Sequence, residues 1–237
     1  MEKVAITKAI AIIAMAIAPM GAIAQDKPET TVAADFVNQY IWRGQDLGDV
    51  AVQPTLGIAY KGLSLTAWGS YGLTDPDDTK EFDLTAAYDI KGFHVGITDY
   101  WFNSPNDRYF CYSAHKTSHV FEANVGYDFG PVALSWYTNF AGNDGVNKSG
   151  DRAYSSYFEI NAPFKFATCD WNATLGAVPY ATSFYAEAGG FAVTNVSVKA
   201  TKEIKVTSSW SIPVFGQIAC NPSTEKAYLV FGFTLQP

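Results

Sequence analysis

The side chains that could do chemistry in this sequence lie in long segments in which polar and apolar residues alternate. Asp83, Glu122 and Glu159 each alternate with aliphatic or aromatic neighbours. Alternation with period 2 is typical of a β-strand that has one apolar and one polar face. The polar faces together collect these candidate functional residues: Asp35, Arg43, Asp83, His94, Glu122, Asn124, Tyr137, Glu159, Asn161, Lys199 and Lys205.

Two interpretations of this set stay open. If the strands close into a barrel with their polar faces inward, the residues could line a selectivity path for a small polar solute. They could equally pair with one another and fill the lumen as a polar plug. Arg43 poses the same choice, since its guanidinium could bind a carboxylate or phosphate, or could pair with a luminal acid. We favour pairing, because buried charges are normally paired.

The elements that must carry these residues are hairpins. Three segments repeat an alternating strand that ends near a Tyr, a tight turn with Gly, and a second alternating strand: 56–65, 84–95 and 123–134. Gly between two such runs signals a hairpin, because it tolerates the positive φ of the turn. We expect short turns at 61–62, 91–92, 130–131, 167–170 and 201–202, and about twelve strands, with the first over 31–43.

Three features favour a barrel that spans a membrane over a soluble β-protein. The expected strands have the length that crosses a bilayer at a tilt. Short turns alternate with long polar loops, as in outer-membrane barrels. Tyr60 and Tyr88 lie near short turns, and Trp42 and Trp101 near long loops, as expected for two interfacial aromatic belts. The sequence therefore predicts an all-β, antiparallel, up-and-down transmembrane barrel.

Residues 1–24 read as a secretory signal peptide. Lys3 and Lys8 precede an apolar run, and Ala22-Ile23-Ala24 is a small-residue cleavage site. The mature domain, 25–237, would then be one barrel in the outer membrane, in contact with lipid and lipopolysaccharide. The formal net charge of −7 comes with no basic patch, which argues against nucleic acid as a partner. The sequence does not indicate an oligomeric state.

Three cysteines remain in the mature chain. Cys111 and Cys220 both fall in expected extracellular loops, so a bridge between them is plausible in an oxidising compartment, which would leave Cys169 free. We find no cluster of His and Cys with zinc-like spacing, and we expect neither a metal nor a cofactor.

An enzyme of the outer-membrane phospholipase type would need Ser, His and an orienting Asn or Asp in one row facing lipid. His94 has Gly96, not Ser, two residues on, and His115 and His119 lie in or beside a loop. We therefore expect no enzymatic activity.

The segment Asn38–Gln45, with Pro54 after it and Gly62 at the next turn, resembles the opening motif of the TorF family of porins. That motif holds an aromatic–x–x–Arg–Gly segment followed by a Pro and a hairpin. The resemblance is specific over roughly 32–68 and implies an outer-membrane barrel of poorly defined substrate. This chain has Asn38 and Gln45 where the family usually has Ser, and it ends at Pro237, not on a terminal aromatic.

These observations predict a narrow passive channel for small polar solutes. A non-conducting structural or binding barrel is the alternative, ahead of a lipid hydrolase or a soluble β-barrel.

Overall fold

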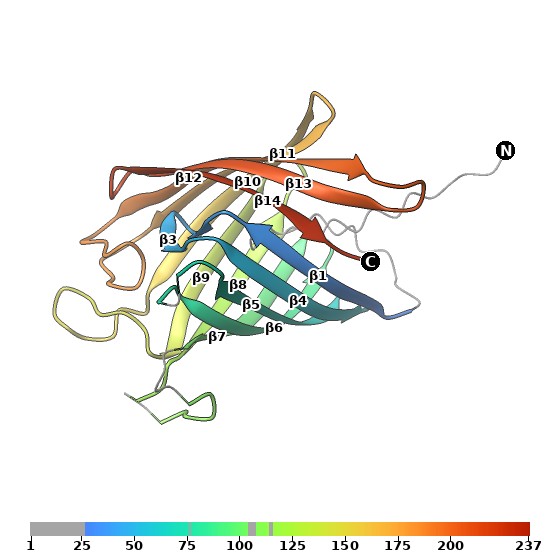
Figure 1. Ribbon diagram of the computed structural model, residues 1–237. Coiled ribbons are helices and arrows are strands. Elements are labelled where there is room, and N and C mark those ends of the chain that lie inside the picture. Colours follow the sequence, from blue (N-terminus) through green and yellow to red (C-terminus); the bar gives the residue numbers. More distant parts are fainter. Residues whose placement is uncertain (1–26, 76, 104–107, 114–115) are drawn as a thin grey trace.

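The computed structural model of the chain describes residues 27–75, 77–103, 108–113 and 116–237. Its body is a closed antiparallel barrel of twelve strands (Figure 1). The barrel strands are β1 (Glu29–Val37), β4 (Ala51–Tyr60), β5 (Leu63–Gly72), β6 (Lys80–Ile90), β7 (Phe93–Asn103), β8 (His119–Asp128), β9 (Ala133–Gly142), β10 (Ser156–Phe166), β11 (Cys169–Val178), β12 (Ala192–Lys205), β13 (Ser211–Asn221) and β14 (Lys226–Leu235). The predicted all-β antiparallel barrel of about twelve strands is confirmed. Across the described ranges, no helix has the length and apolar character to cross a bilayer.

The barrel wall is apolar outside and polar inside. Neighbouring residues show this directly: Leu56 is 59% exposed and Thr55 4%, while Leu229 is 64% exposed and Val230 5%. Because successive side chains point to opposite faces of a strand, each strand presents one set to the outside and the other to the lumen. The buried set consists of more polar than apolar residues, which is the reverse of a soluble domain.

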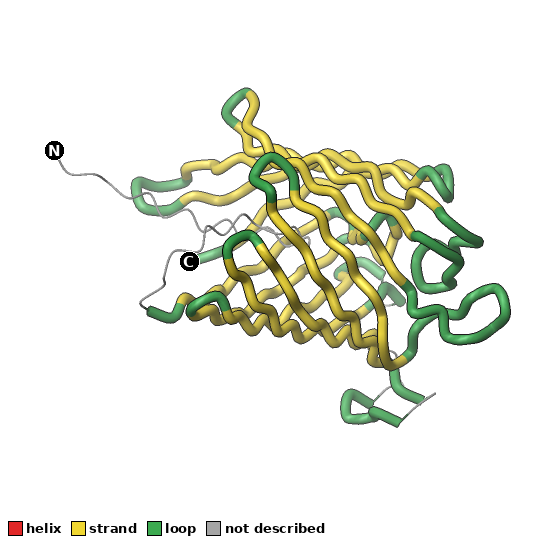
Figure 2. The backbone as a smooth tube through the Cα atoms, turned by 180° about the vertical axis from the view of Figure 1, so that it is seen from behind, coloured by secondary structure: helices red, strands yellow, loops and turns green. Residues whose placement is uncertain are grey.

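The connections sort by length to the two ends of the barrel (Figure 2). At the short-turn end, Lys61-Gly62 and Lys91-Gly92 form two-residue turns with positive φ at both positions. Such turns match the twist of a hairpin, and Gly adopts the second position without a Cβ clash. The first residue of β1 and the last residue of β14 both lie at this end, as an even number of strands requires. The long loops gather at the other, long-loop end.

Two expected strand boundaries are wrong. The turn expected at 201–202 lies inside β12, and β12 and β13 instead meet at 206–210. There Val206 and Thr207 donate no ladder hydrogen bond to another strand; both backbone N–H groups donate to the carbonyl of Trp210. The first strand, expected over 31–43, ends at Val37, and the chain then leaves the wall.

Asn38 completes the wall where the chain leaves it. The register of β1 with β14 extends over four pairs, whereas β1 and β4 share nine. Beyond the last pair, the Asn38 side chain donates to the Leu229 carbonyl at 3.1 Å and accepts from the Phe231 N–H at 2.7 Å. An amide side chain thus takes the place of the backbone that β1 no longer supplies.

Candidate functional site

The segment after Asn38 forms a second hairpin that folds into the lumen. Its strands are β2 (Tyr40–Trp42) and β3 (Gln45–Gly48), and its turn is Arg43-Gly44. Arg43 has a φ of 50° and Gly44 a φ of 80°, the same combination as the Lys-Gly turns at the short-turn end. The sequence therefore repeats its hairpin chemistry here, but the hairpin points inward instead of extending the wall.

Arg43 at the tip of this hairpin is paired with Glu122 of β8. Its Nη1 lies 2.5 Å from Oε2 of Glu122 and its Nη2 lies 3.1 Å from Oε1, a bidentate arrangement. Two tyrosine hydroxyls also donate to this carboxylate, Tyr100 at 2.9 Å and Tyr185 at 2.7 Å. The Glu122 side chain is fully buried, so these donors replace water around the carboxylate.

Four aromatic rings enclose the guanidinium group. The distances from Arg43 Cζ to the ring centroids are 4.1 Å for Tyr137, 4.5 Å for Trp42, 4.7 Å for Tyr157 and 5.4 Å for Tyr185. All four fall within the range in which a ring face attracts a cation. We call these four rings, with Glu122, the lumen cage.

The hairpin is anchored at both its tip and its base. The Asn221 amide donates to the Gly44 carbonyl at 2.9 Å, and a Cβ on Gly44 would overlap the Thr194 carbonyl oxygen. Near the base, the Tyr40 hydroxyl donates to Glu81 at 2.9 Å. The hairpin thus bridges the lumen between β6 on one side and β12 and β13 on the other.

The loop from 179 to 191 completes the closure. Gln45 accepts from the Ala186 N–H at 2.8 Å, and Phe184 packs edge-on against Trp42. Burial raises the pKa of Tyr185 well above its ordinary value, which keeps its hydroxyl as a donor to Glu122. Burial by itself would lower the pKa of Arg43, but Glu122, Tyr185 and Tyr100 together outweigh it and the net shift of the pKa is upward, so the guanidinium stays charged.

The inner face is fully buried in the long-loop half of the barrel and partly exposed near the short-turn end. Glu122, Tyr157 and Asn139 in the long-loop half have no exposed area. The inward-facing His94 and Asp89, near the 91–92 turn, keep side-chain exposures of 23% and 27%. The exposure of the inner face therefore decreases from the 91–92 turn towards the lumen cage.

Most candidate residues from the sequence do lie on the inner face. Asp35, Asp83, Asn124, Glu159 and Asn161 are buried there, as are Glu122, Tyr137 and Arg43. Lys199 places its Nζ 3.9 Å from the ring centroid of Phe215, and His94 pairs with Asp89 at 2.7 Å. Lys205 does not line the lumen, because it is exposed at the end of β12, beyond the last residue paired with β11.

Sequence reasoning missed the aromatic part of the site apart from Tyr137. Trp42 was expected in an interfacial aromatic belt, but the inward hairpin places it in the lumen against Tyr100, and places Tyr40 there against Trp68. Tyr100 and Tyr157 stand at the alternate positions of their strands that carry the polar side chains. Their positions in the alternation were therefore the available signal that these aromatic rings point inward. Glu81, two residues before Asp83 on the same face, was also overlooked.

One histidine–carboxylate pair lies on the outer face. His119 Nδ1 is 2.7 Å from Asp99, and its Nε2 is 2.5 Å from the Tyr109 carbonyl. A catalytic serine would need that second nitrogen as its base. Here that nitrogen is bound to a carbonyl, and the imidazole ring of His119 stacks on Tyr112. The pair therefore holds the 108–113 loop against the wall.

The cysteines do not form the expected bridge. Cys111, Cys169 and Cys220 are all free thiols. Cys220 lies within β13, opposite Val196, and not in a loop, so the topological reason for pairing it with Cys111 is lost.

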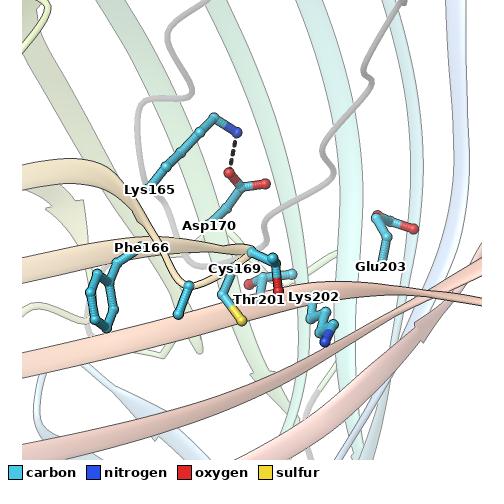
Figure 3. A pocket seen from close by; sticks show the side chains of 9 residues that line it. Lys165, Phe166, Cys169, Asp170, Thr201, Lys202 and Glu203 are labelled. Carbon is cyan, nitrogen blue, oxygen red and sulfur yellow. Dashed lines mark hydrogen bonds and ion pairs between the residues drawn. The ribbon is translucent and has the colours of Figure 1, made fainter.

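A cavity of about 570 Å³ lies at the short-turn end, where the turn between β10 and β11 meets β12 (Figure 3). Lys165 and Asp170 form an ion pair at its rim, and Lys202 and Glu203 add two exposed charges. Its side chains are mostly solvated and make no contact with the lumen cage that the structure records. We therefore assign it no role in the site.

Comparison with known proteins gives only distant similarities. No family model and no curated sequence matches the chain, so the resemblance to the TorF family stays a prediction. Among solved structures, a porin is 13% identical, with a TM-score of 0.35 over 80% of this chain and 63% of that one. Salmonella typhi OmpF in complex with daunomycin is 11% identical, with a TM-score of 0.35 over 89% of this chain and 97% of that one. An outer membrane channel from Pseudomonas putida F1 is also 11% identical, with a TM-score of 0.37 over 92% of this chain and 98% of that one. With TM-scores below 0.5, none of these similarities carries an argument about the function of this chain.

Proposed function

We propose that this protein is an outer-membrane channel for small polar solutes, and that the β2–β3 hairpin holds it closed in the state described. The observation that carries the proposal is that the barrel wall is apolar outside and polar inside, the reverse of a soluble barrel. A closed barrel with an apolar exterior and a polar interior satisfies every backbone group within lipid and offers polar groups to a solute. The segment that resembles the TorF motif is the same one that forms the hairpin.

In this orientation the short-turn end faces the periplasm and the long loops face the exterior and its lipopolysaccharide. Tyr60, Tyr88 and Tyr127, each at least 40% exposed, then ring the periplasmic edge of the apolar band. Export requires a signal peptide, which the sequence predicts at residues 1–24, outside the described residues. Enzymatic activity is not part of the proposal.

Placing a charge on the middle of the outer face tests the lipid contact. Leu84→Arg, near the centre of β6, is expected to lower the free energy of unfolding by about 2–4 kcal/mol in lipid vesicles. Ile90→Arg is the matched control, because Ile90 is equally exposed, at 42%, but lies at the end of the same strand. There the expected loss is about 0–1 kcal/mol, as for a charge at an interface. Equal losses at the two positions, measured by urea unfolding, would count against a membrane-spanning wall.

Displacing the hairpin tip tests the closure. Gly44→Val places a branched side chain against the Thr194 carbonyl and strains a φ of 80°, so the tip cannot seat. We expect single-barrel conductance in planar bilayers to rise several-fold above that of the wild type. Gly150→Val is the matched control: its φ of 83° is similar, but nothing lies within 4 Å of the added Cβ. If both folded variants conduct like the wild type, the hairpin tip is not the closure.

A further inference from the structure

We infer that the lumen cage is a binding site for organic cations, and that Arg43 occupies it as a built-in ligand. The inference rests on the proposed channel and names the class of solute: small molecules with a guanidinium or alkylammonium group. Such a solute would enter the cage when the hairpin withdraws, and would then lie in the solute path.

The first support is the completeness of the cage around a cation. Apart from Trp42, the residues that contact the guanidinium come from the wall and the 179–191 loop: Tyr137 from β9, Tyr157 from β10, Glu122 from β8, and Tyr185 from the loop. Of the cage, Trp42 alone moves with the hairpin. If the hairpin leaves, the wall retains a carboxylate with two tyrosine donors and three ring faces, an arrangement that favours cations.

The second support is the charge of the interior. Among the buried residues of the described chain, five are carboxylic acids and Arg43 is the one guanidinium; Lys199, next to Phe215, is a second basic residue on the inner face. The acids are Asp35, Glu81, Asp83, Glu122 and Glu159. Carboxyl groups thus outnumber basic groups on the inner face, and a lining of this kind favours cations over anions.

The third support is a set of buried acceptors around the cage. The amide oxygens of Asn124, Asn139 and Asn195 are buried and have no hydrogen-bond partner among the described residues. Asn124 lies opposite Tyr137 in the β8–β9 register, Asn139 lies opposite Glu122, and Asn195 donates to the Tyr157 hydroxyl. Buried acceptors are normally paired, so these oxygens suit a ligand rich in N–H donors.

The experiment removes Arg43 and returns its functional group as a free molecule. Arg43→Ala in lipid vesicles is expected to unfold at lower urea concentration than the wild type. Millimolar methylguanidinium chloride is expected to restore much of this midpoint, while methylurea, which has the same planar shape without the charge, is not. Sodium chloride at equal ionic strength controls for screening. The wild type, whose cage is filled, should not respond.

Glu122 provides the control variant. In Arg43→Ala/Glu122→Gln the cage keeps its size but loses its carboxylate, so the methylguanidinium effect should largely disappear. The inference is overturned if methylguanidinium shifts Arg43→Ala no more than sodium chloride does, or shifts the wild type or the double variant equally.

A second measurement covers the case in which Arg43→Ala does not fold. In a barrel that lacks the hairpin altogether, methylguanidinium should protect the cage tyrosines from collisional quenching by acrylamide, and methylurea should not. Equal quenching with both compounds would overturn the inference. Both readouts report binding, not conduction, so a barrel that binds methylguanidinium but never conducts would refute the channel and leave the cation site standing.

Discussion

Glu122→Gln is expected to lower the free energy of unfolding by about 3–5 kcal/mol, the largest effect of any single conservative substitution in the lumen. The change keeps the shape of the side chain and removes its charge. Arg43 would then stay enclosed without the charge of its paired carboxylate, because its aromatic neighbours offer ring faces and the neutral hydroxyl of Tyr185, which accepts from Nη1 at 2.6 Å. The cost arises from the stranded guanidinium more than from the lost hydrogen bonds.

The measurement is urea unfolding in lipid vesicles, followed by tryptophan fluorescence. Guanidinium chloride is unsuitable as the denaturant, because it would also be a ligand for the cage. Glu203→Gln, an exposed acid on β12, is the control and should change stability by less than about 0.5 kcal/mol. The double variant Arg43→Met/Glu122→Gln should recover most of the loss, because replacing both partners of a buried pair is often neutral. A Glu122→Gln barrel as stable as Glu203→Gln would show that the pair is not buried in solution.

Excising the hairpin is expected to produce the largest rise in conductance. Val37 and Ala51 are register partners of β1 and β4, so the chain can turn directly between them. Removing 39–49 and joining Asn38 to Val50 through two glycines retains the Asn38 contacts to β14 and creates an ordinary hairpin end. The lumen then loses Arg43, Trp42 and Tyr40, and with them the bridge between its walls.

The control trims an exposed loop at the same end of the barrel. Residues 148–150 lie at the tip of the loop between β9 and β10, and their removal should leave conductance unchanged. Heat-modifiable migration on gels confirms that each variant is a folded barrel. A folded excision variant without channel events in planar bilayers would contradict the channel and favour a non-conducting structural barrel.

The alternation of apolar and polar residues was sufficient to predict the wall. In β6, the residues from Phe82 to Ile90 keep strict period 2, and the structure places Asp83 inside and Leu84 outside as the pattern requires. The turns at 61–62 and 91–92 were predictable because Lys-Gly supplies the two positive φ angles. The 206–210 turn was not, because Thr, Ser and Trp there carry no comparable signal and β12 continues its alternation through 201–202.

The lumen cage could be predicted only in part. Glu122, Tyr137 and Glu159 stand at the alternate strand positions that carry polar side chains, and this pattern correctly predicted that they lie inside the barrel. The inward fold of the hairpin was beyond local sequence reasoning, because Tyr40 and Trp42 resume the apolar alternation of β1 after the single polar residue Asn38. Its direction depends on contacts with residues far along the chain, such as Asn221 at the tip and Tyr185 from a loop. The Arg-Gly turn shortly after Asn38, which resembles the two Lys-Gly hairpin turns, was the available clue.

The short seam between β1 and β14 has a consequence for the folding rate. Every other neighbouring pair in the wall joins strands that follow one another along the chain, so each can form soon after its turn. The seam joins residues such as Asp35 and Thr234, which are 199 positions apart, with few backbone pairs to offset the loss of chain entropy. Closure should therefore be the slow step of folding. Until it occurs, the sheet presents two open edges on which another copy of the chain could pair. The Asn38 side chain pairs with β14 just beyond the seam and so covers part of one of these edges once the barrel is closed.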